Sequence, residues 1–539
     1  MAWLSKLIQY LTILAVTIPP TFSSQCPGPD CSNKAVNSSV KTSNGLIIGH
    51  PALQFPDVNE FLGVPYASAP IGDLRFAAPV NLRSSRGVVA NHYGPYVSAP
   101  ILENCPTSND AFPSFPGMTP QEPKIINAFL KVNGTQSEDC LYLNIWAKPD
   151  SSKLKPVMLW IHGGRFVITS AESLNYDGQT LAAKHDVIVV TINYRLNIFG
   201  FSGAPGLPQN VGLLDQRMAV EWVHRNIKAF GGDPDRITVF GSSAGGTSVD
   251  LYSYAWAHDP IVSGIISHSG TALSYKPNTP EQSSNAFFSA SKSLGCGGHT
   301  AKPEQVVECM RQKPWQDVFN ASLQVPLVQT VTIPEPVFHP VVDGITVFSD
   351  YAKRSSEGKF ARVPFLVTSN NNEAGFYRLA AQAANITVSD ETWNEFNLAA
   401  FTCPSGKAAK DRIANGVPAW QARYFGDWEN LRLYAGSGAY HGSDLPMIFG
   451  NVERIAGLPD SEAEKKVSRY MASAWVAFAT DPGNGLKKFG WPKYNLHEKT
   501  IAGLAYDNKP DVRFLEPRQF DSRCAELEGK SLIVGDGAI

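Results

Sequence analysis

The fold is decided by one stretch of sequence, Arg236-Ile237-Thr238-Val239-Phe240-Gly241-Ser242-Ser243-Ala244-Gly245-Gly246. An apolar, β-branched run stops at a Gly-x-Ser-x-Gly pentapeptide, and a helix-compatible segment follows at once. Strand, very tight turn and helix form the context that presents a serine nucleophile, which makes Ser243 the candidate and Ser242 the variable position. Glycines at 241 and 245 fit a steric demand, because a Cβ beside the strained turn would collide with a neighbouring element. A Ser/Gly turn without chemistry is the alternative interpretation.

The segments around this stretch alternate between buried strands and a helix. Residues 156–161 are apolar throughout, residues 187–192 are apolar except for Thr191, and apolar residues recur at helical spacing between 213 and 227. Fully apolar strands that alternate with helices favour a large, mostly parallel sheet covered by helices on both faces. The sequence therefore predicts an α/β fold. Residues 277–440 are richer in Gly, Pro and Asn, and we expect helices and loops from them over the carboxyl edge of the sheet.

Two further segments have distinct patterns. Residues 102–138 contain five prolines and are predicted to form an irregular loop. Near the C-terminus, Asp460 is expected to cap a helix whose apolar stripe begins at Val467. The chain of 539 residues is 43% hydrophobic and has no repeat or linker, so residues 24–539 are predicted to form a single domain. The net charge of −2 gives no electrostatic argument for binding nucleic acid or an anionic membrane.

The N-terminus has the pattern of a secretory signal. Lys6 precedes an apolar run over residues 7–18, and the small residues Thr21 and Ser23 fit a cleavage rule. We expect residues 1–23 to be a signal peptide. A membrane anchor is the competing interpretation, but an apolar run of about a dozen residues is too short to span a bilayer.

Cysteines and glycosylation sequons also indicate an oxidising compartment, so the protein is predicted to be secreted. All eight cysteines follow the signal, which is the usage of extracellular proteins. Glycosylation sequons begin at Asn37, Asn133, Asn320 and Asn385. The cysteines are scattered, and neither Cys-x-x-Cys nor His-x-x-x-His occurs, so no metal site is predicted.

An activated serine needs a base, an acid that orients the base, and donors for the oxyanion. In one common arrangement the chain order is serine, acid, histidine. Glu373 and Asp343 are the candidate acids, and only His441 and His497 lie beyond Glu373. Glu373 ends an apolar strand in a polar turn, and His441 lies in a glycine-rich loop that can present an imidazole. His497 lies in a polar stretch and is expected at the surface.

Five separated motifs carry a resemblance to a known family. They are Gly63-Val64-Pro65-Tyr66-Ala67, Leu74-Arg75-Phe76, Ser137-Glu138-Asp139-Cys140-Leu141-Tyr142-Leu143-Asn144, Ala229-Phe230-Gly231-Gly232-Asp233-Pro234 ahead of the Ser243 pentapeptide, and Pro340-Val341-Val342-Asp343-Gly344. Over nearly all of its mature length, the chain resembles a type B carboxylesterase of the cholinesterase/lipase family. The resemblance implies the α/β-hydrolase fold, ester hydrolysis through an acyl-enzyme, and no cofactor.

The resemblance also implies roles for particular residues. Carried over by position, the catalytic triad is Ser243, Glu373 and His441, and Ser269 supports the triad acid. Asp343 belongs to a structural motif. Arg75 and Glu138 form a buried ion pair in the family. The implied disulfides are Cys105–Cys140, Cys296–Cys309 and Cys403–Cys524, which leaves Cys26 and Cys31 to pair with each other.

The oxyanion donors implied by the family are the backbone N–H groups of Gly164, Arg165 and Ala244. The chain departs from the family at Arg165, where glycine is usual, and at Ser242, where glutamate is usual. Arg165 can still donate its N–H provided that its φ is negative. Together the departures make the mouth of the site more positive, and our hypothesis is that cationic esters are disfavoured. The alternative is that Arg165 points away and pairs with an acid elsewhere.

The sequence thus predicts a secreted serine esterase acting on a small-molecule ester. A lipase is an alternative, with the loop between Cys105 and Cys140 as its lid. A cholinesterase would stack its cation on a tryptophan in that loop, where this chain has Phe112, Phe115 and Phe129 instead, although Phe376 matches an aromatic of the choline site. A non-catalytic binding protein on the same fold is a further alternative, but such relatives lose the nucleophile or the base.

Overall fold

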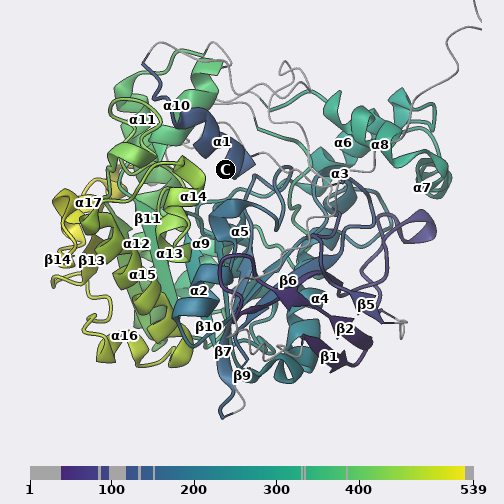
Figure 1. Ribbon diagram of the computed structural model, residues 1–539. Coiled ribbons are helices and arrows are strands. Elements are labelled where there is room, and N and C mark those ends of the chain that lie inside the picture. Colours follow the sequence, from purple (N-terminus) through teal and green to yellow (C-terminus); the bar gives the residue numbers. More distant parts are fainter. Residues whose placement is uncertain are drawn as a thin grey trace, which may run out of the picture. The chain divides into compact units, whose positions relative to one another are not determined.

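The computed structural model describes residues 38–82, 87–95, 117–130, 135–149, 152–328, 332, 335–383 and 386–527 (Figure 1). Several sequence predictions fall outside these residues and stay predictions. They are the signal peptide 1–23, the cysteines 26, 31 and 105, and the sequons at Asn37, Asn133 and Asn385.

The described residues form a sheet of eleven strands whose central part is parallel. From edge to edge the strands are β14 (Arg513–Leu515), β13 (Ile501–Leu504), β12 (Ala419–Tyr424), β11 (Phe365–Asn370), β10 (Gly264–His268), β9 (Gly232–Ser242), β7 (Lys155–Ile161), β8 (Ile188–Ile192), β6 (Tyr142–Ala147), β4 (Asn59–Pro65) and β3 (His50–Pro51). Strands β13 to β8 pair in parallel, and the pairs beyond them are antiparallel. A smaller sheet contains β1 (Ser39–Thr42), β2 (Gly45–Ile48) and β5 (Val88–Val89).

The two faces of the sheet are packed against different groups of helices. Along β7, Val157, Leu159 and Ile161 enter one hydrophobic cluster, while Met158 and Trp160 enter another, as alternation along a strand requires. The first cluster includes residues of α3 (Asn197–Gly200), α4 (Val211–Asn226), α5 (Ala244–Ala255), α6 (Pro280–Ser293), α7 (Pro303–Gln312), α8 (Trp315–Leu323), α9 (Tyr351–Ser356) and α12 (Cys403–Ala414). The second includes residues of α1 (Glu122–Leu130), α2 (Gln179–Lys184), α13 (Leu445–Phe449), α14 (Val452–Ala456), α15 (Glu462–Thr480) and α16 (Gly485–Lys488). The predicted α/β fold, with a mostly parallel sheet and helices on both faces, is confirmed.

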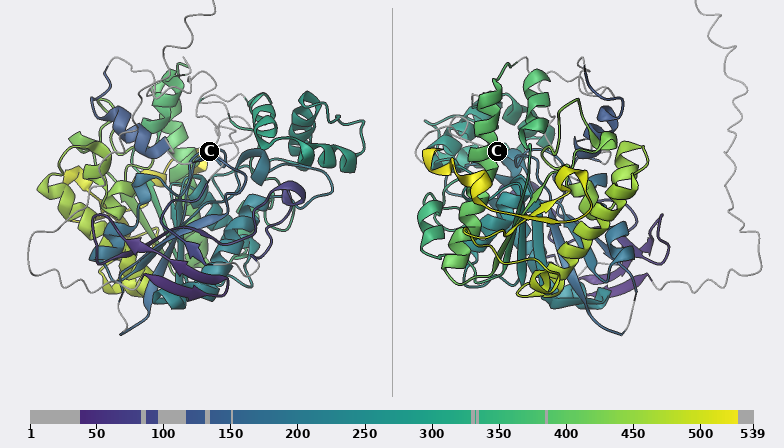
Figure 2. Two further views of the ribbon diagram at one scale, coloured as in Figure 1. Left: turned by 45° about the vertical axis from the view of Figure 1, so that its right-hand side comes forward. Right: turned by 90° about the vertical axis from the view of Figure 1, so that its left-hand side faces the viewer.

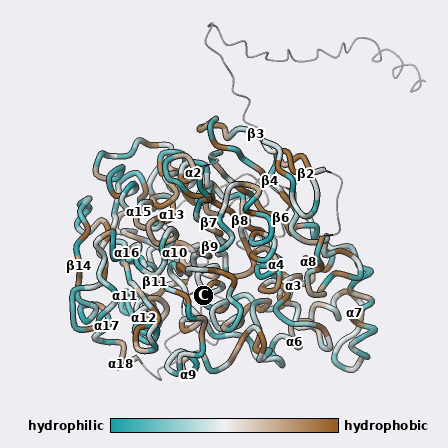
Figure 3. The backbone as a smooth tube through the Cα atoms, turned by 90° about the horizontal axis from the view of Figure 1, so that it is seen from below, coloured by the Kyte–Doolittle hydropathy of each residue, from teal (hydrophilic) through white to brown (hydrophobic). Residues whose placement is uncertain are grey.

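The remaining elements lie near the ends of the strands and at the C-terminus. They are α10 (Ala374–Ala383), α11 (Asp390–Phe396), α17 (Arg518–Asp521), α18 (Cys524–Leu527), a π-helical turn at Asn397–Thr402, and 3₁₀ turns at Gly72–Leu74, Leu174–Tyr176, Ile227–Phe230, Glu429–Leu431 and Tyr506–Asn508. Figures 1 and 2 show α1 with α10 and α11 as one group of helices, and α6 with α7 and α8 as another. In Figure 3, hydrophobic segments gather around the central strands β7, β8 and β9. Among the helices of the described residues, none is both long and apolar enough to cross a membrane.

Strand register brings the predicted site residues to one edge. Ile161 pairs with Gly241, Gly241 with Ser267, and His268 with Thr368, so β7, β9, β10 and β11 end close to the same level. The oxyanion loop, Ser243, Ser269 and Glu373 follow these four strands in that order. The sheet therefore positions all four segments at its carboxyl edge.

Three local predictions were wrong. Helix α1 occupies residues 122–130 of the predicted irregular segment, and strand β12 lies within residues 277–440, where helices and loops were expected. The cap of α15 is Ser461 and not Asp460: its side chain accepts from the Glu464 N–H, and Glu464 in turn bonds the Ser461 N–H.

Among the described residues there are two disulfides, Cys296–Cys309 and Cys403–Cys524. Cys140 is buried and is not bonded to any described cysteine. Its predicted partner, Cys105, lies outside the described residues, so that pairing stays a prediction.

Candidate active site

Ser243 occupies a strained turn between β9 and α5. Its φ is 59° and its ψ is −125°, a conformation that L-residues rarely adopt. A Cβ on Gly241 would lie 2.5 Å from the Gly245 carbonyl oxygen, and one on Gly245 would lie 2.0 Å from the Ile161 carbonyl oxygen. Both glycines are therefore sterically required, as the pentapeptide predicts. The Ser243 N–H donates to the His268 carbonyl at 2.9 Å, which fixes the turn against β10.

Glu373 and His441 form a close buried pair. His441 Nδ1 lies 2.6 Å from Glu373 Oε2, and the other carboxylate oxygen accepts from Ser269 Oγ at 2.7 Å and from the Asn370 N–H at 2.6 Å. Glu373 is 1% exposed and His441 8% exposed. Within the described residues, His441 Nε2 is buried and has no hydrogen-bond partner. With Nδ1 held by the carboxylate, Nε2 is the nitrogen available for proton transfer.

Aromatic side chains surround the imidazole of His441. The rings of Tyr377, Phe401 and Phe376 have centroids 5.1, 5.3 and 6.4 Å from it. Burial and the nearby Glu373 carboxylate raise the pKa of Tyr377 well above its usual value, and its hydroxyl is within hydrogen-bonding reach of Ser243. Tyr377 therefore stays neutral and places a polar group beside the candidate nucleophile.

The predicted oxyanion loop follows β7 and packs directly on the Ser243 turn. A Cβ on Gly163 would lie 2.5 Å from the Ser242 carbonyl oxygen, so the loop can approach this closely only with glycine there. His162 opens the loop. Its ring stacks on Tyr194 at 4.6 Å, and burial lowers its pKa to about 4, so the imidazole is neutral near pH 7. Across the turns, loops and caps of the described chain, the N–H groups of Gly164 and Ala244 have no backbone acceptor.

Arg165 departs from one expectation and matches an alternative. Its φ is +56°, so the negative φ that the sequence argument required of a non-glycine residue is not found. Its guanidinium lies 2.6 Å from Glu335 Oε2, with the side chains 23% and 6% exposed. Arg165 therefore pairs with an acid, as the alternative interpretation proposed, and its charge is offset next to the site. Glu335 was not predicted, because nothing in its local sequence marks it.

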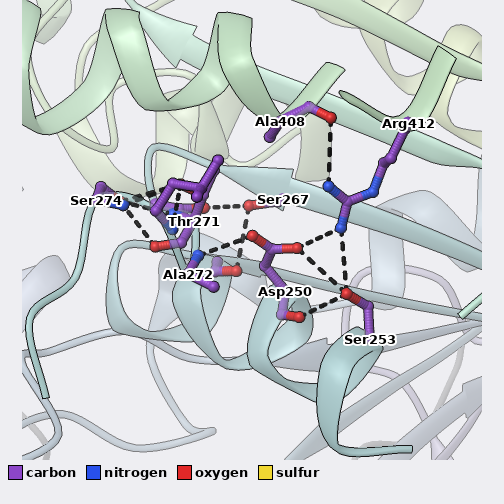
Figure 4. Close-up of polar contacts among 11 residues, drawn as sticks. Asp250, Ser253, Ser267, Thr271, Ala272, Ser274, Ala408 and Arg412 are labelled. Atoms are coloured by element: carbon purple, nitrogen blue, oxygen red, sulfur yellow. Dashed lines mark hydrogen bonds and ion pairs between the residues drawn. The ribbon is translucent and has the colours of Figure 1, made fainter. Parts of the chain in front are cut away.

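A buried ion pair between α5 and α12 links segments around the candidate site (Figure 4). Asp250 of α5 accepts from the Ala272 N–H at 2.7 Å and pairs with Arg412 of α12. The Arg412 guanidinium lies 3.6 Å from the centre of the Phe365 ring on β11. One pair of charges thus links α12 to the helix after Ser243, the loop after Ser269 and the strand before Glu373.

The other predicted residues lie in structural positions. The Asp343 carboxylate accepts from the N–H groups of Thr346 and Val347 and closes a turn. Arg75 and Glu138 make two hydrogen bonds of 2.6 Å and are buried. His497 is exposed and contacts Arg518, and Asn320 is exposed on α8.

Further residues at the site were missed by sequence reasoning, namely Asn370, Tyr377, His268 and Asp444. The polar run Ser369-Asn370-Asn371-Asn372 at a strand end was a usable signal for Asn370. Asp444 lies three residues after His441, a spacing that could have been noticed, whereas Tyr377 looks like an ordinary aromatic on a helix.

Comparison with known proteins places this architecture. The family model described as "Carboxylesterase family" matches residues 36–400 and 380–522. The chain is 33% identical to Secreted lipase 5 of Gibberella zeae, covering 95% of this chain and 98% of that protein, and 36% identical to a chlorogenic acid esterase of Aspergillus niger, covering 88% and 89%. A solved structure of a PNB esterase superposes with a TM-score of 0.71 at 27% identity, covering 90% of this chain and 99% of that one. The chain therefore belongs to the carboxylesterase family of ester hydrolases.

Proposed function

We propose that this ester hydrolase is a secreted serine esterase in which Ser243, His441 and Glu373 form the catalytic triad. The observation that carries the proposal is the 2.6 Å contact between His441 Nδ1 and Glu373 Oε2 beside the strained Ser243 turn. A carboxylate on Nδ1 leaves Nε2 as the base, and the turn exposes a serine hydroxyl at the edge of the sheet where that base lies.

The mechanism is acyl transfer in two steps. His441 Nε2 takes the proton of Ser243 Oγ as this oxygen attacks the ester carbonyl, and the N–H groups of Gly164 and Ala244 stabilise the oxyanion. The positive φ of Arg165 leaves its N–H out of this set of donors. Collapse breaks the bond to the alcohol oxygen, which receives the proton from His441. Water then attacks the acyl-enzyme with His441 as base again, and the carboxylic acid leaves. The Glu373 carboxylate orients the imidazole and stabilises its cation, while Ser269 and the Asn370 N–H hold the carboxylate in place.

Labelling with a serine-reactive fluorophosphonate tests the proposal. The wild-type protein should bind one equivalent of probe, and peptide mass spectrometry should locate it at Ser243. Ser243→Ala should abolish labelling, whereas Ser242→Ala is the matched control and should keep it. Absence of labelling in the folded wild type would favour the non-catalytic binding protein over an esterase.

Secretion is part of the proposal. The signal pattern over residues 1–23 and the two disulfides support an oxidising destination. When the full chain is expressed in a secretory host, the protein in the medium should begin at residue 24 or 25. Retention of the intact N-terminus on the membrane fraction would instead support an anchor.

The substrate class we propose is an uncharged carboxylic ester in solution. The Arg165–Glu335 pair offsets the cationic charge next to the site, which removes the expected bias against cationic esters. A cholinesterase is not favoured. The α1 ring whose centroid lies 6.2 Å from that of Phe376 belongs to Phe129, whereas a cholinesterase would use a tryptophan to stack on its cationic substrate. A lipase is the second candidate, and the similarity to Secreted lipase 5 supports it. Rates on an emulsified triacylglycerol above and below its solubility limit distinguish the two, because a rise in rate at the interface marks a lipase.

A further inference from the structure

A hydrogen-bonded network of buried polar side chains connects to the Glu373–His441 pair. Its members are Asn370 at the end of β11, Asp444 just after His441, His268 at the end of β10 and Trp475 of α15, and each is at most 3% exposed. Asp444 Oδ1 accepts from Asn370 Nδ2 at 3.1 Å, and Asp444 Oδ2 lies 3.1 Å from His268 Nδ1. Trp475 Nε1 donates to His268 Nε2 at 3.0 Å. This network therefore joins strands β10 and β11, the loop that contains His441, and helix α15.

The hydrogen positions in this network follow from donor chemistry. An indole N–H can only donate, so His268 Nε2 must be the acceptor of the Trp475 bond. The proton of the neutral imidazole is then on Nδ1, which donates to Asp444 Oδ2. Asn370 Nδ2 donates one hydrogen to Asp444 Oδ1 and the other to the Tyr440 carbonyl at 3.0 Å. Each oxygen of the Asp444 carboxylate thus accepts from one fixed donor.

Through Asn370, this network reaches both the acid Glu373 and the segment that carries the base His441. The backbone N–H of Asn370 donates to Glu373 Oε1, and its side chain holds the carbonyl of Tyr440, the residue before His441. One residue therefore sets the position of the acid and of the backbone that carries the base. Asp444 fixes the orientation of the Asn370 amide that does so.

We propose that Asp444 is a positioning residue for His441. It acts through Asn370, and hydrogen bonds from His268 to Asp444 and from Trp475 to His268 hold it in place. The inference rests on the proposed function, because it concerns the base of that triad. A polar cluster that only stabilises the fold would show the same burial. A positioning role is distinguished by kinetics, because a misplaced base slows proton transfer without weakening the binding of substrate.

Asp444→Asn is the decisive substitution because it preserves shape. Asn370 Nδ2 and His268 Nδ1 both donate to the wild-type carboxylate, but the new amide has only one oxygen to accept a hydrogen bond. Its N–H₂ group therefore opposes one of these two donors. His268 cannot relieve the conflict by moving its proton, since Trp475 occupies Nε2. With p-nitrophenyl butyrate we expect kcat to fall about 10- to 100-fold and KM to change less than about threefold. The rate constant for fluorophosphonate labelling of Ser243 should fall in parallel.

A second substitution tests the tautomer argument. In the Asp444→Asn background, Trp475→Phe frees His268 Nε2 to carry the proton, and Nδ1 can then accept from the new amide. We expect the double variant to recover at least about fivefold in kcat over Asp444→Asn, although Trp475→Phe alone lowers kcat. Losses that simply multiply, with no recovery, would overturn the proposal.

Controls separate positioning from folding. Glu138→Gln perturbs another buried polar pair, which bonds Arg75 away from the triad loops, and should lower Tm with kcat unchanged in the folded protein. If Asp444→Asn is not secreted, Asn370→Ser removes the bond to the Tyr440 carbonyl and keeps the backbone N–H, and its kcat should fall at least about tenfold. Wild-type kcat in either variant contradicts the inference. A wild type that does not label at Ser243 contradicts the proposed function instead.

Discussion

Three of the non-glycine residues with positive φ lie in segments of the candidate site. Ser243, Arg165 and Ser269 have φ values of 59°, 56° and 47°, and each follows the end of a parallel strand. Such a conformation costs about 1–3 kcal/mol per residue and persists only where the surroundings determine it. Steric need explains why the glycines around Ser243 could be predicted from sequence. The left-handed Arg165 could not be predicted, because its stabilising contact with Glu335 comes from a distant part of the chain.

The first prediction concerns the triad. Ser243→Ala and His441→Ala should each lower kcat by about 10⁴-fold or more, and Glu373→Ala by less, because the carboxylate orients and stabilises but does not react. Initial rates on p-nitrophenyl butyrate measure this, with Ser242→Ala as the matched control. A variant without the His441 imidazole that kept near-normal turnover would show that another base acts.

The second prediction concerns the Arg165–Glu335 pair. The pair is neutral as a whole, so the wild type should show little preference between matched cationic and anionic esters. Arg165→Gly leaves the Glu335 carboxylate without the guanidinium, and the ratio of kcat/KM for the cationic over the anionic ester should rise about three- to tenfold. Arg165→Gly with Glu335→Gln should restore the wild-type ratio. An unchanged ratio in the single variant would mean that the pair has no electrostatic contact with substrate.

Elements differ in how well their sequences announce them. β7 is apolar after Lys155, β8 is apolar except for Thr191, and α15 has a clear apolar stripe, so all three could be predicted. β12 could not, because Gln421 and Arg423 interrupt its apolar run although both are buried. Arg423 is accommodated there by hydrogen bonds to Asn371 and Thr402.

Helix α1 was missed for a different reason. Its Pro123 and the prolines before it suggest a loop, yet proline is tolerated in the first turn of a helix, where its missing N–H has no partner to lose. The helix brings the Phe129 ring to 6.5 Å from the ring of Tyr440, the residue before His441. It therefore belongs to the wall of the site and not to an irregular flap.

The third prediction concerns Glu122 of α1 and the pH dependence of the free energy of unfolding. Burial raises the pKa of the Glu122 carboxyl from 4.5 to about 7. The folded state therefore favours the neutral acid: this stability is fully present below pH 4.5 and is lost as the pH rises through 7. Glu122→Gln keeps a neutral isostere at every pH, and should match the wild type at pH 4.5 and exceed it by about 1–2 kcal/mol at pH 8. Urea unfolding at both pH values measures the difference. Equal stability of the two proteins at pH 8 would mean that the carboxylate is solvated.

At the scale of the whole molecule, the sequence predicted the layers of the fold but not how distant segments are joined. Alternating strands and helices implied the parallel sheet, and the order of the triad residues followed from the chain order of the motif. The disulfides came from family resemblance, because spacing alone does not decide among pairings. The links that hold the site, such as Asp250 with Arg412, join segments far apart in sequence and have no local signature.

The fourth prediction compares the two disulfides that the structure contains. Cys403–Cys524 closes a loop with a sequence separation of 121, and Cys296–Cys309 one of 13. In the chain-entropy model the long loop stabilises by about 5 kcal/mol and the short one by about 3 kcal/mol. The long bridge also fastens α18 to the start of α12, whose Arg412 pairs with Asp250 of α5. We therefore expect Cys403→Ser with Cys524→Ser to lower Tm more than Cys296→Ser with Cys309→Ser, measured at one scan rate in the presence of the same buffer. If the short-loop variant melts lower, local packing around α7 outweighs loop entropy, and the C-terminal segment is held mainly by β13 and β14.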